Sequence, residues 1–151
     1  MADGVFNIAK GRVAHYATLP ESSDALIVVL LKSSGLQADG TLADHDTLAA
    51  VLGSNSEADF TNYARKTLSG VTVNVDDSND RVDVDASDIT YTAAGGASNN
   101  TIGKLLICYD ANTGSGTDAD IIPLTYHDAS FTTDGTDQTI QFAAAGFYRA
   151  S

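Results

Sequence analysis

Residues 71–85 of this chain read Val71-Thr72-Val73-Asn74-Val75-Asp76-Asp77-Ser78-Asn79-Asp80-Arg81-Val82-Asp83-Val84-Asp85. β-Branched apolar residues alternate with polar ones on both sides of a turn-rich centre, a pattern that predicts a β-hairpin. Because successive side chains of a strand point to opposite faces, one face of this hairpin should be dry and the other acidic and hydrated. The run therefore indicates a mainly β protein.

The chain after this hairpin also has the pattern of short strands. They are expected at residues 89–91, 103–109, 121–126, 130–133 and 139–142, between clusters of Gly, Asn, Asp and Ser. Asp134-Gly135 predicts a tight turn that joins the last two strands as a hairpin. Closely spaced short strands favour an antiparallel β-sandwich or barrel-like domain.

The chain before the hairpin contains one strand signal and one helix signal. Residues 25–31 form a continuous apolar run, which is typical of a strand covered on both faces. Thr41-Leu42-Ala43-Asp44 resembles a capping box with Asp in place of Glu, and apolar residues on one helical face follow it up to Gly53. We therefore expect one short helix over residues 41–52. Residues 57–68 fit a helix or a strand equally well.

The length of 151 residues fits one domain. We expect residues 17–151 to form a single β-rich domain and residues 1–16 to form either an extended N-terminal arm or a first strand. The arm would use Lys10 and Arg12 to contact the acidic surface of a neighbouring subunit. On that hypothesis, removal of residues 1–12 weakens assembly and leaves the domain folded.

The charge of the chain argues against nucleic acid as a partner. Twenty acidic and eight basic residues give a net charge of −12, and such a field repels a polyanion. A membrane partner is not expected either, because the longest apolar run, residues 25–31, is too short to cross a bilayer. No basic stretch followed by an apolar core of signal-peptide length is present near the start, so we expect synthesis in the cytoplasm.

The sequence predicts no catalytic residue, cofactor or metal, and hence no enzyme. Cys108 is the only cysteine and lies in an apolar run, which favours a packed core thiol over a nucleophile. The three histidines lack metal-ligand spacing. Eighteen aspartates supply carboxylate pairs by chance, without the apolar pocket that would separate two pKa values.

The acid-rich loops suggest a calcium site. Asp76, Ser78 and Asp80 alternate as oxygen ligands often do, but an EF-hand would need Gly at Arg81 and Glu at Ser87. The EF-hand is therefore excluded. A calcium site of another kind in a β loop stays an alternative to a hydrated hairpin tip.

Four stretches of the chain together resemble a family of small virion structural proteins of tailed bacteriophages, especially those of actinobacterial hosts. They are Met1-Ala2-Asp3-Gly4-Val5-Phe6-Asn7-Ile8-Ala9-Lys10-Gly11-Arg12-Val13, Tyr63-Ala64-Arg65-Lys66-Thr67-Leu68 before the hairpin, Gly103-Lys104-Leu105-Leu106-Ile107-Cys108-Tyr109-Asp110, and Gly146-Phe147-Tyr148-Arg149. The resemblance spans most of the chain, and the family has no catalytic motif to carry over.

The resemblance implies a virion location and a head (capsid) decoration protein that binds the shell in many copies. Its expected partners are the major capsid protein or other virion proteins, and further copies of itself in a homo-oligomer such as a trimer. The expected contact residues are Phe6, Lys10, Arg12, Phe147, Tyr148 and Arg149.

Two other functions stay open at this stage. The first is a tail or fibre-associated structural protein whose tyrosines and Asn/Gly-rich loops bind a host receptor or a glycan. The second is a hydrolase that acts on the host envelope.

Overall fold

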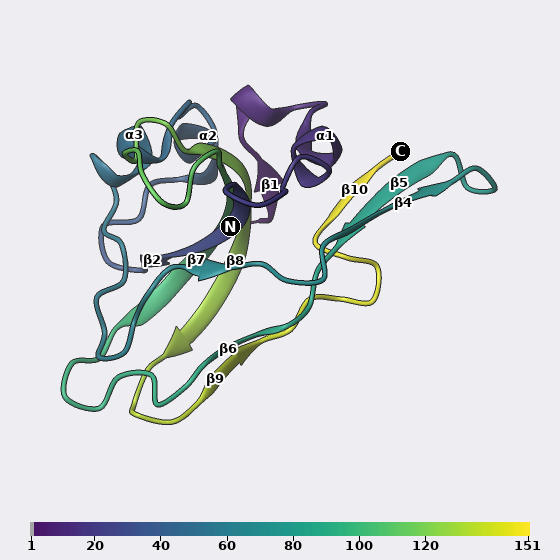
Figure 1. The fold of residues 1–151 in the computed structure, drawn as a ribbon. Helices are drawn as coiled ribbons and strands as arrows, with labels where there is room; N and C mark the ends of the chain where they lie inside the picture. The colour runs from purple at the N-terminus through teal and green to yellow at the C-terminus, as the bar shows by residue number, and fades with distance from the viewer. Residues whose placement is uncertain (1) are drawn as a thin grey trace.

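The computed structural model describes residues 2–151 and has three antiparallel β-sheets, so the expectation of a mainly β, sandwich-like domain is confirmed (Figure 1). The strands are β1 (Gly4–Val5), β2 (Ala25–Lys32), β3 (Lys66–Thr67), β4 (Thr72–Asp76), β5 (Arg81–Asp85), β6 (Ile89–Tyr91), β7 (Thr101–Asp110), β8 (Ile122–Thr132), β9 (Gln138–Ile140) and β10 (Tyr148–Ala150). The helices are η1 (Asn7–Ala9), α1 (Val13–Ala17), α2 (Asp39–Leu42) and α3 (Leu48–Leu52). None of the helices in this described part is long and apolar enough to cross a bilayer.

The largest sheet has the strand order β1-β8-β7-β2-β3. Strand β2 pairs with β7 along its whole length, and every one of its residues except Lys32 is buried. Both faces of the sheet are therefore covered, as the continuous apolar run predicted. Strand β8 is a single strand of 11 residues, where the sequence suggested two.

Alternate residues of β2 enter two separate hydrophobic cores. Leu26, Val28 and Leu30 pack against α1, β5 and β6 on one face of the sheet. Ile27, Val29 and other residues of opposite parity pack against α2 and α3 on the other face. The small sheets and α1 thus cover one face of the central sheet, and α2 and α3 cover the other.

Residues 71–85 form the predicted hairpin as β4 and β5, and β10 adds a third strand beside β5. This sheet projects away from the central sheet, at the upper right in Figure 1. The expectation of a dry apolar face holds only at its base, where Val84 is fully buried. It is wrong at the outer end, where Val75 is 65% exposed, because the projecting end reaches beyond the core.

Asp134-Gly135 makes a turn but not a hairpin. Strand β8 pairs with β1 and β7, whereas β9 pairs with β6 in a separate two-stranded sheet. Gly135 has φ of 96°, a conformation that glycine adopts without steric cost. The turn therefore carries the chain from one sheet to another, and a local turn signal alone does not specify which strands pair.

The expected helix over residues 41–52 is wrong in its extent, and the described chain has three short α-helices instead of one. Helix α2 ends at Leu42 and α3 begins at Leu48. The carbonyl of Ala43 accepts a hydrogen bond from the Asn7 amide at 2.8 Å, a tertiary bond made where the helix was expected to continue. Thr41 lies inside α2, whose N-cap is Ala38, so the predicted capping box does not form. Thr47 instead caps α3 by accepting from the Ala50 amide at 3.2 Å. Residues 57–68 are mostly loop and contain β3.

The N-terminal segment forms a first strand, one of the two alternatives considered. Strand β1 pairs with β8, with Gly4 opposite Tyr126. A Cβ atom at position 4 would overlap the Tyr126 ring, so only glycine fits there. Phe6, Ala9 and Val13 are fully buried. Removal of residues 1–12 would therefore take side chains out of the core, in contrast to the sequence-based expectation of a dispensable arm.

Candidate subunit interface

The structure does not bring the six residues expected at an interface together as one surface, and five of them fall into two groups. Phe147, Tyr148 and Arg149 line a pocket with residues 3–5 of the N-terminal strand. Lys10 and Arg12 lie in the turn between η1 and α1. The C-terminal group thus approaches β1, whereas the two N-terminal cations stand apart from it.

Phe6 is a core residue. Its side chain is fully buried, and its ring meets Tyr126 edge to face with centroids 5.4 Å apart. Burial of an aromatic ring of this kind stabilises the fold by several kcal/mol, about 3–5 kcal/mol judged from truncation to Ala. Phe6 therefore fastens β1 to the central sheet and presents no surface to a partner.

Lys10 and Arg12 are exposed and have no ion pair or aromatic contact within residues 2–151. The remaining six of the eight cations each contact a carboxylate or an aromatic ring. Ile8, which is 38% exposed, lies in the same segment. We call Ile8, Lys10 and Arg12 the basic turn. On a chain with a net charge of −12, this is a local patch of opposite sign.

The C-terminal group contributes mainly to contacts within the chain. Arg149 donates from Nε to Asp83 Oδ1 at 2.5 Å, and this bond lowers the pKa of Asp83, with a smaller effect from Arg81. The Phe147 ring lies edge-on to His127, with centroids 6.4 Å apart. Tyr148 pairs with Val84 in the ladder of the projecting sheet. Tyr148 and Arg149 thus fix β10 to β5, whereas Phe147 contacts β8.

The outer end of the projecting sheet carries a shallow apolar groove. Val75, Val82 and Ala150 lie side by side on three neighbouring strands, because Val82 is the register partner of both other residues. Asp77 and Asp80 lie beside them at the hairpin turn and are exposed. We call these five residues the sheet tip. Its apolar row is the part of the expected dry face that the core does not cover.

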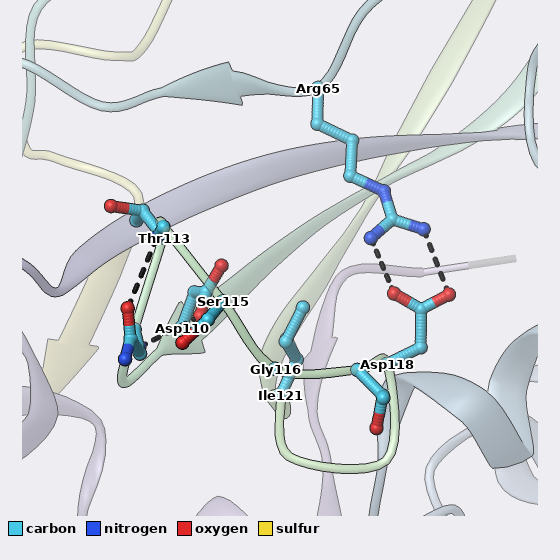
Figure 2. A pocket seen from close by; sticks show the side chains of 10 residues that line it. Arg65, Asp110, Thr113, Ser115, Gly116, Asp118 and Ile121 are labelled. Carbon is cyan, nitrogen blue, oxygen red and sulfur yellow. Dashed lines mark hydrogen bonds and ion pairs between the residues drawn. The ribbon is translucent and has the colours of Figure 1, made fainter.

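A second pocket lies beside the loop of residues 111–120, and Arg65 reaches into it (Figure 2). The Arg65 guanidinium donates to Asp118 in the parallel arrangement seen in Figure 2, with the shorter bond at 2.6 Å. It also donates to Glu57 at 2.7 Å. The hydrogen bonds to Glu57 and Asp118 raise the pKa of Arg65. Since both carboxylates already occupy the guanidinium, the network joins the α3–β3 connection to the β7–β8 loop and leaves Arg65 little capacity to bind an anionic ligand.

A buried lysine is the polar centre that the sequence-based reasoning missed. The Lys104 ammonium is fully buried and donates to Asp128 Oδ1 at 2.6 Å and to the Ala2 carbonyl at 2.9 Å. Asp39 Oδ1 lies 2.9 Å away. Burial lowers the pKa of Lys104, but the hydrogen bonds to Asp128 and Asp39 outweigh this effect, and the pKa is raised. A lysine within the apolar run of residues 102–108 was the available signal, since a buried ammonium needs carboxylate partners.

Asp76 and Cys108 have structural roles in the fold. Asp76 accepts from the Asn79 side chain at 2.7 Å and from its amide at 3.2 Å, so its carboxylate closes the hairpin turn. Cys108 is fully buried, and this burial raises the pKa of its thiol. Within residues 2–151 no three His, Cys, Asp or Glu side chains are grouped so that they could hold a metal ion.

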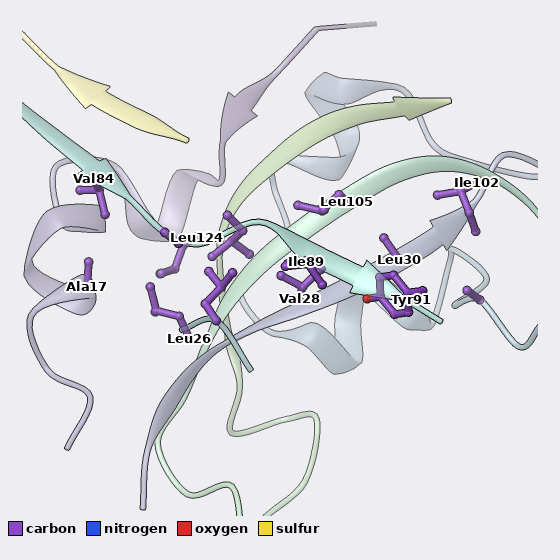
Figure 3. Packing of buried hydrophobic residues seen from close by; sticks show 14 of the residues in the cluster. Ala17, Leu26, Val28, Leu30, Val84, Ile89, Tyr91, Ile102, Leu105 and Leu124 are labelled. Atoms are coloured by element: carbon purple, nitrogen blue, oxygen red, sulfur yellow. The ribbon is translucent and has the colours of Figure 1, made fainter. Parts of the chain in front are cut away.

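The base of the projecting sheet is anchored in the first core. Val84 points from β5 toward the cluster that contains Leu124 and Ala17 (Figure 3). Helix α1 packs against β4 and β5 from the side. The sheet is therefore held at its base by the core, and its tip is exposed.

Comparisons with protein-family models, with curated proteins and with solved structures found no match to this chain.

Proposed function

We propose that this chain is a structural protein that works by binding other protein subunits in an assembly of many copies. The observation that carries this proposal is the distribution of unpaired charge. Lys10 and Arg12 have no carboxylate partner in the described chain, and an exposed apolar residue, Ile8, lies beside them. Surfaces that combine an exposed apolar group with unpaired charge are suited to binding a protein of complementary charge.

The more specific proposal is a decoration protein on the head of a tailed bacteriophage. Its support is the resemblance of four sequence stretches to small virion structural proteins. A small acidic β domain also suits attachment in many copies to a shell. The expected partners are the major capsid protein and neighbouring copies of this chain.

The location of the chain in virions tests this proposal. Particles are to be separated into emptied heads and free tails, and each fraction is to be analysed by quantitative peptide mass spectrometry. A decoration protein is expected in the heads at a copy number that matches the capsomers. Recovery in tails alone would replace the proposal with the tail or fibre alternative, and absence from both fractions would end the virion proposal.

A purified-component assay tests the binding mode. Shells that lack the chain are incubated with the purified protein, and the bound fraction is measured by sedimentation. Saturable binding at a fixed number of copies per shell is expected. Failure of a folded protein to bind heads that natively contain it would contradict the proposal that it attaches to a preformed shell.

A further inference from the structure

The described chain has two exposed large hydrophobic residues, and they lie in patches of opposite charge. Val75 is 65% exposed and Ile8 is 38% exposed. Val75 belongs to the sheet tip with Asp77 and Asp80, whereas Ile8 belongs to the basic turn with Lys10 and Arg12. Each patch thus has the apolar centre and charged border typical of a small protein interface.

Hydrogen bonds and buried neighbours hold the backbone of the basic turn. The Ile8 segment is closed by hydrogen bonds from the Ala9 amide to the Phe6 carbonyl at 2.9 Å and from the Arg12 amide to the Ala9 carbonyl at 2.8 Å. Asn7 donates from its side chain to Asp44 at 2.6 Å. Because Phe6 and Ala9 are buried on the other side, the exposed side chains need little ordering of the backbone to bind a partner.

The sheet tip carries negative charge, although Arg81 adjoins it. The Arg81 guanidinium lies 3.3 Å from Asp76 and 3.0 Å from Asp83 and is neutralised by them. Asp77 and Asp80 make no side-chain hydrogen bond or ion pair within residues 2–151. Two free carboxylates therefore border the apolar row formed by Val75, Val82 and Ala150.

We propose that the sheet tip of one copy of this chain docks onto the basic turn of a second copy. Val75 then contacts Ile8 of the second copy, and Asp77 and Asp80 approach Lys10 and Arg12 of that copy. Both patches are open to solvent in the single chain, so neither covers the other within one molecule. This inference rests on the proposed function, in which the basic turn binds protein, and it names the partner surface.

The two patches are different surfaces, so the contact need not be limited to a dimer. A contact between unlike patches leaves one of each kind free and generates a ring when the rotation closes. Repetition of the contact around a symmetric shell would also link neighbouring copies. Every copy then uses both patches, which accounts for the presence of both on one small chain.

Charge reversal on the full chain tests the proposal. One variant, K10E/R12E, has two acidic patches, and the other, D77K/D80K, has two basic patches. Self-association of each variant, measured by sedimentation velocity over a concentration series, is expected to weaken by about tenfold or more relative to the original chain. In an equimolar mixture, the two variants are expected to associate, because each acidic patch then meets a basic one.

The control variant E21K/D46K reverses the charge of two exposed carboxylates outside both patches and should associate like the original chain. Circular dichroism checks that every variant is folded. The variant V75S keeps all charges and removes the exposed apolar group, so it is expected to weaken association by about tenfold.

The inference would be overturned if the original chain stays monomeric at ~1 mM. A contact whose Kd lies above that concentration is too weak to count as specific docking. The inference would also be overturned if the mixture of charge-reversed variants fails to associate while each variant is folded. Neither result bears on whether the chain is found in heads, which the virion fractionation decides separately. Conversely, self-association of a chain absent from virions would remove the proposed location and leave the docking contact in place.

Discussion

Lys104 and Asp128 are direct partners in the ladder between β7 and β8, and their side chains are joined by a hydrogen bond of 2.6 Å. The ammonium is fully buried and also contacts Asp39 and the backbone of residue 2. One cation therefore connects two strands of the central sheet, the start of α2 and the N-terminal segment. Because the ammonium of Lys104 is buried, the stability of the fold depends on the groups that contact it.

Replacement of this cation should destabilise the protein strongly. The variant K104M leaves the carboxylates of Asp39 and Asp128 without their cation, at an expected cost of about 2–4 kcal/mol in the free energy of unfolding. The lower limit of this range applies because water hydrates the carboxylate of Asp128, whose side chain is 41% exposed. Urea denaturation measures the change. The control K32M removes a cation from a surface ion pair and should have a small effect; equal losses in both variants would contradict the role assigned to Lys104.

His127 should make stability depend on pH between neutral and mildly acidic conditions. Burial lowers the pKa of His127 below its ordinary value near 6.5, and the interaction with Asp3 offsets this only in part. Because the unfolded chain takes up the proton first, this contribution to stability is present above pH ~6.5 and is lost as pH falls from there through the folded pKa. The slope from one proton is at most about 1.4 kcal/mol per pH unit.

The variant H127Q should remove this slope, whereas H15Q, which changes an exposed histidine, should keep it. The measurement is the free energy of unfolding from urea titrations at a series of pH values between 5 and 8. A slope that is unchanged in H127Q would show that other groups cause the pH dependence.

Phe6 should behave as a core residue and Ile8 as a surface residue. The variant F6A removes a fully buried ring beside Tyr126, and we expect a loss of about 3–5 kcal/mol. I8A truncates a side chain that is 38% exposed and should change stability by less than about 1 kcal/mol. Thermal denaturation of the two variants compares positions that are two residues apart. A small effect of F6A would restore the hypothesis of an independent N-terminal arm.

Cys108 should be inert in the native protein. Its thiol is fully buried, and burial raises its pKa, so the reactive thiolate is disfavoured. The expected result is negligible reaction with a thiol reagent such as DTNB in buffer and complete reaction in denaturant. Rapid labelling of the folded chain would contradict the assignment of Cys108 to the core.

The sequence predicts a strand correctly where the pattern of apolar residues matches the faces of the strand that are buried. Residues 25–31 predict β2 because a strand covered on both faces must be apolar throughout. The alternation in residues 71–85 predicts β4 and β5, and residues 89–91 coincide with β6. In these segments the residue types, the spacing and the observed burial agree.

Sequence patterns do not predict the features that depend on tertiary contacts. The predicted helix over residues 41–52 is divided, and an amide from the distant N-terminal segment bonds within the gap. The partners of Arg65 lie at positions 57 and 118, and the partners of Lys104 lie at positions 39 and 128. In the candidate interface, the exposure of Lys10 and Arg12 matches their charge, but the burial of Phe6 depends on Tyr126, a residue that only the folded sheet brings near.

The pairing of the first strand with β8 also has a consequence during synthesis. Asp3 accepts a hydrogen bond from the amide of Asp128, a residue 125 positions later in the chain. At ~5–20 residues per second, a ribosome needs roughly 6–25 s to make the intervening polypeptide. Strand β1 is thus translated well before its partner β8, and it can pair only after β8 has been made. Until then the Phe6 ring has no Tyr126 beside it, so burial of this side chain waits for the synthesis of β8.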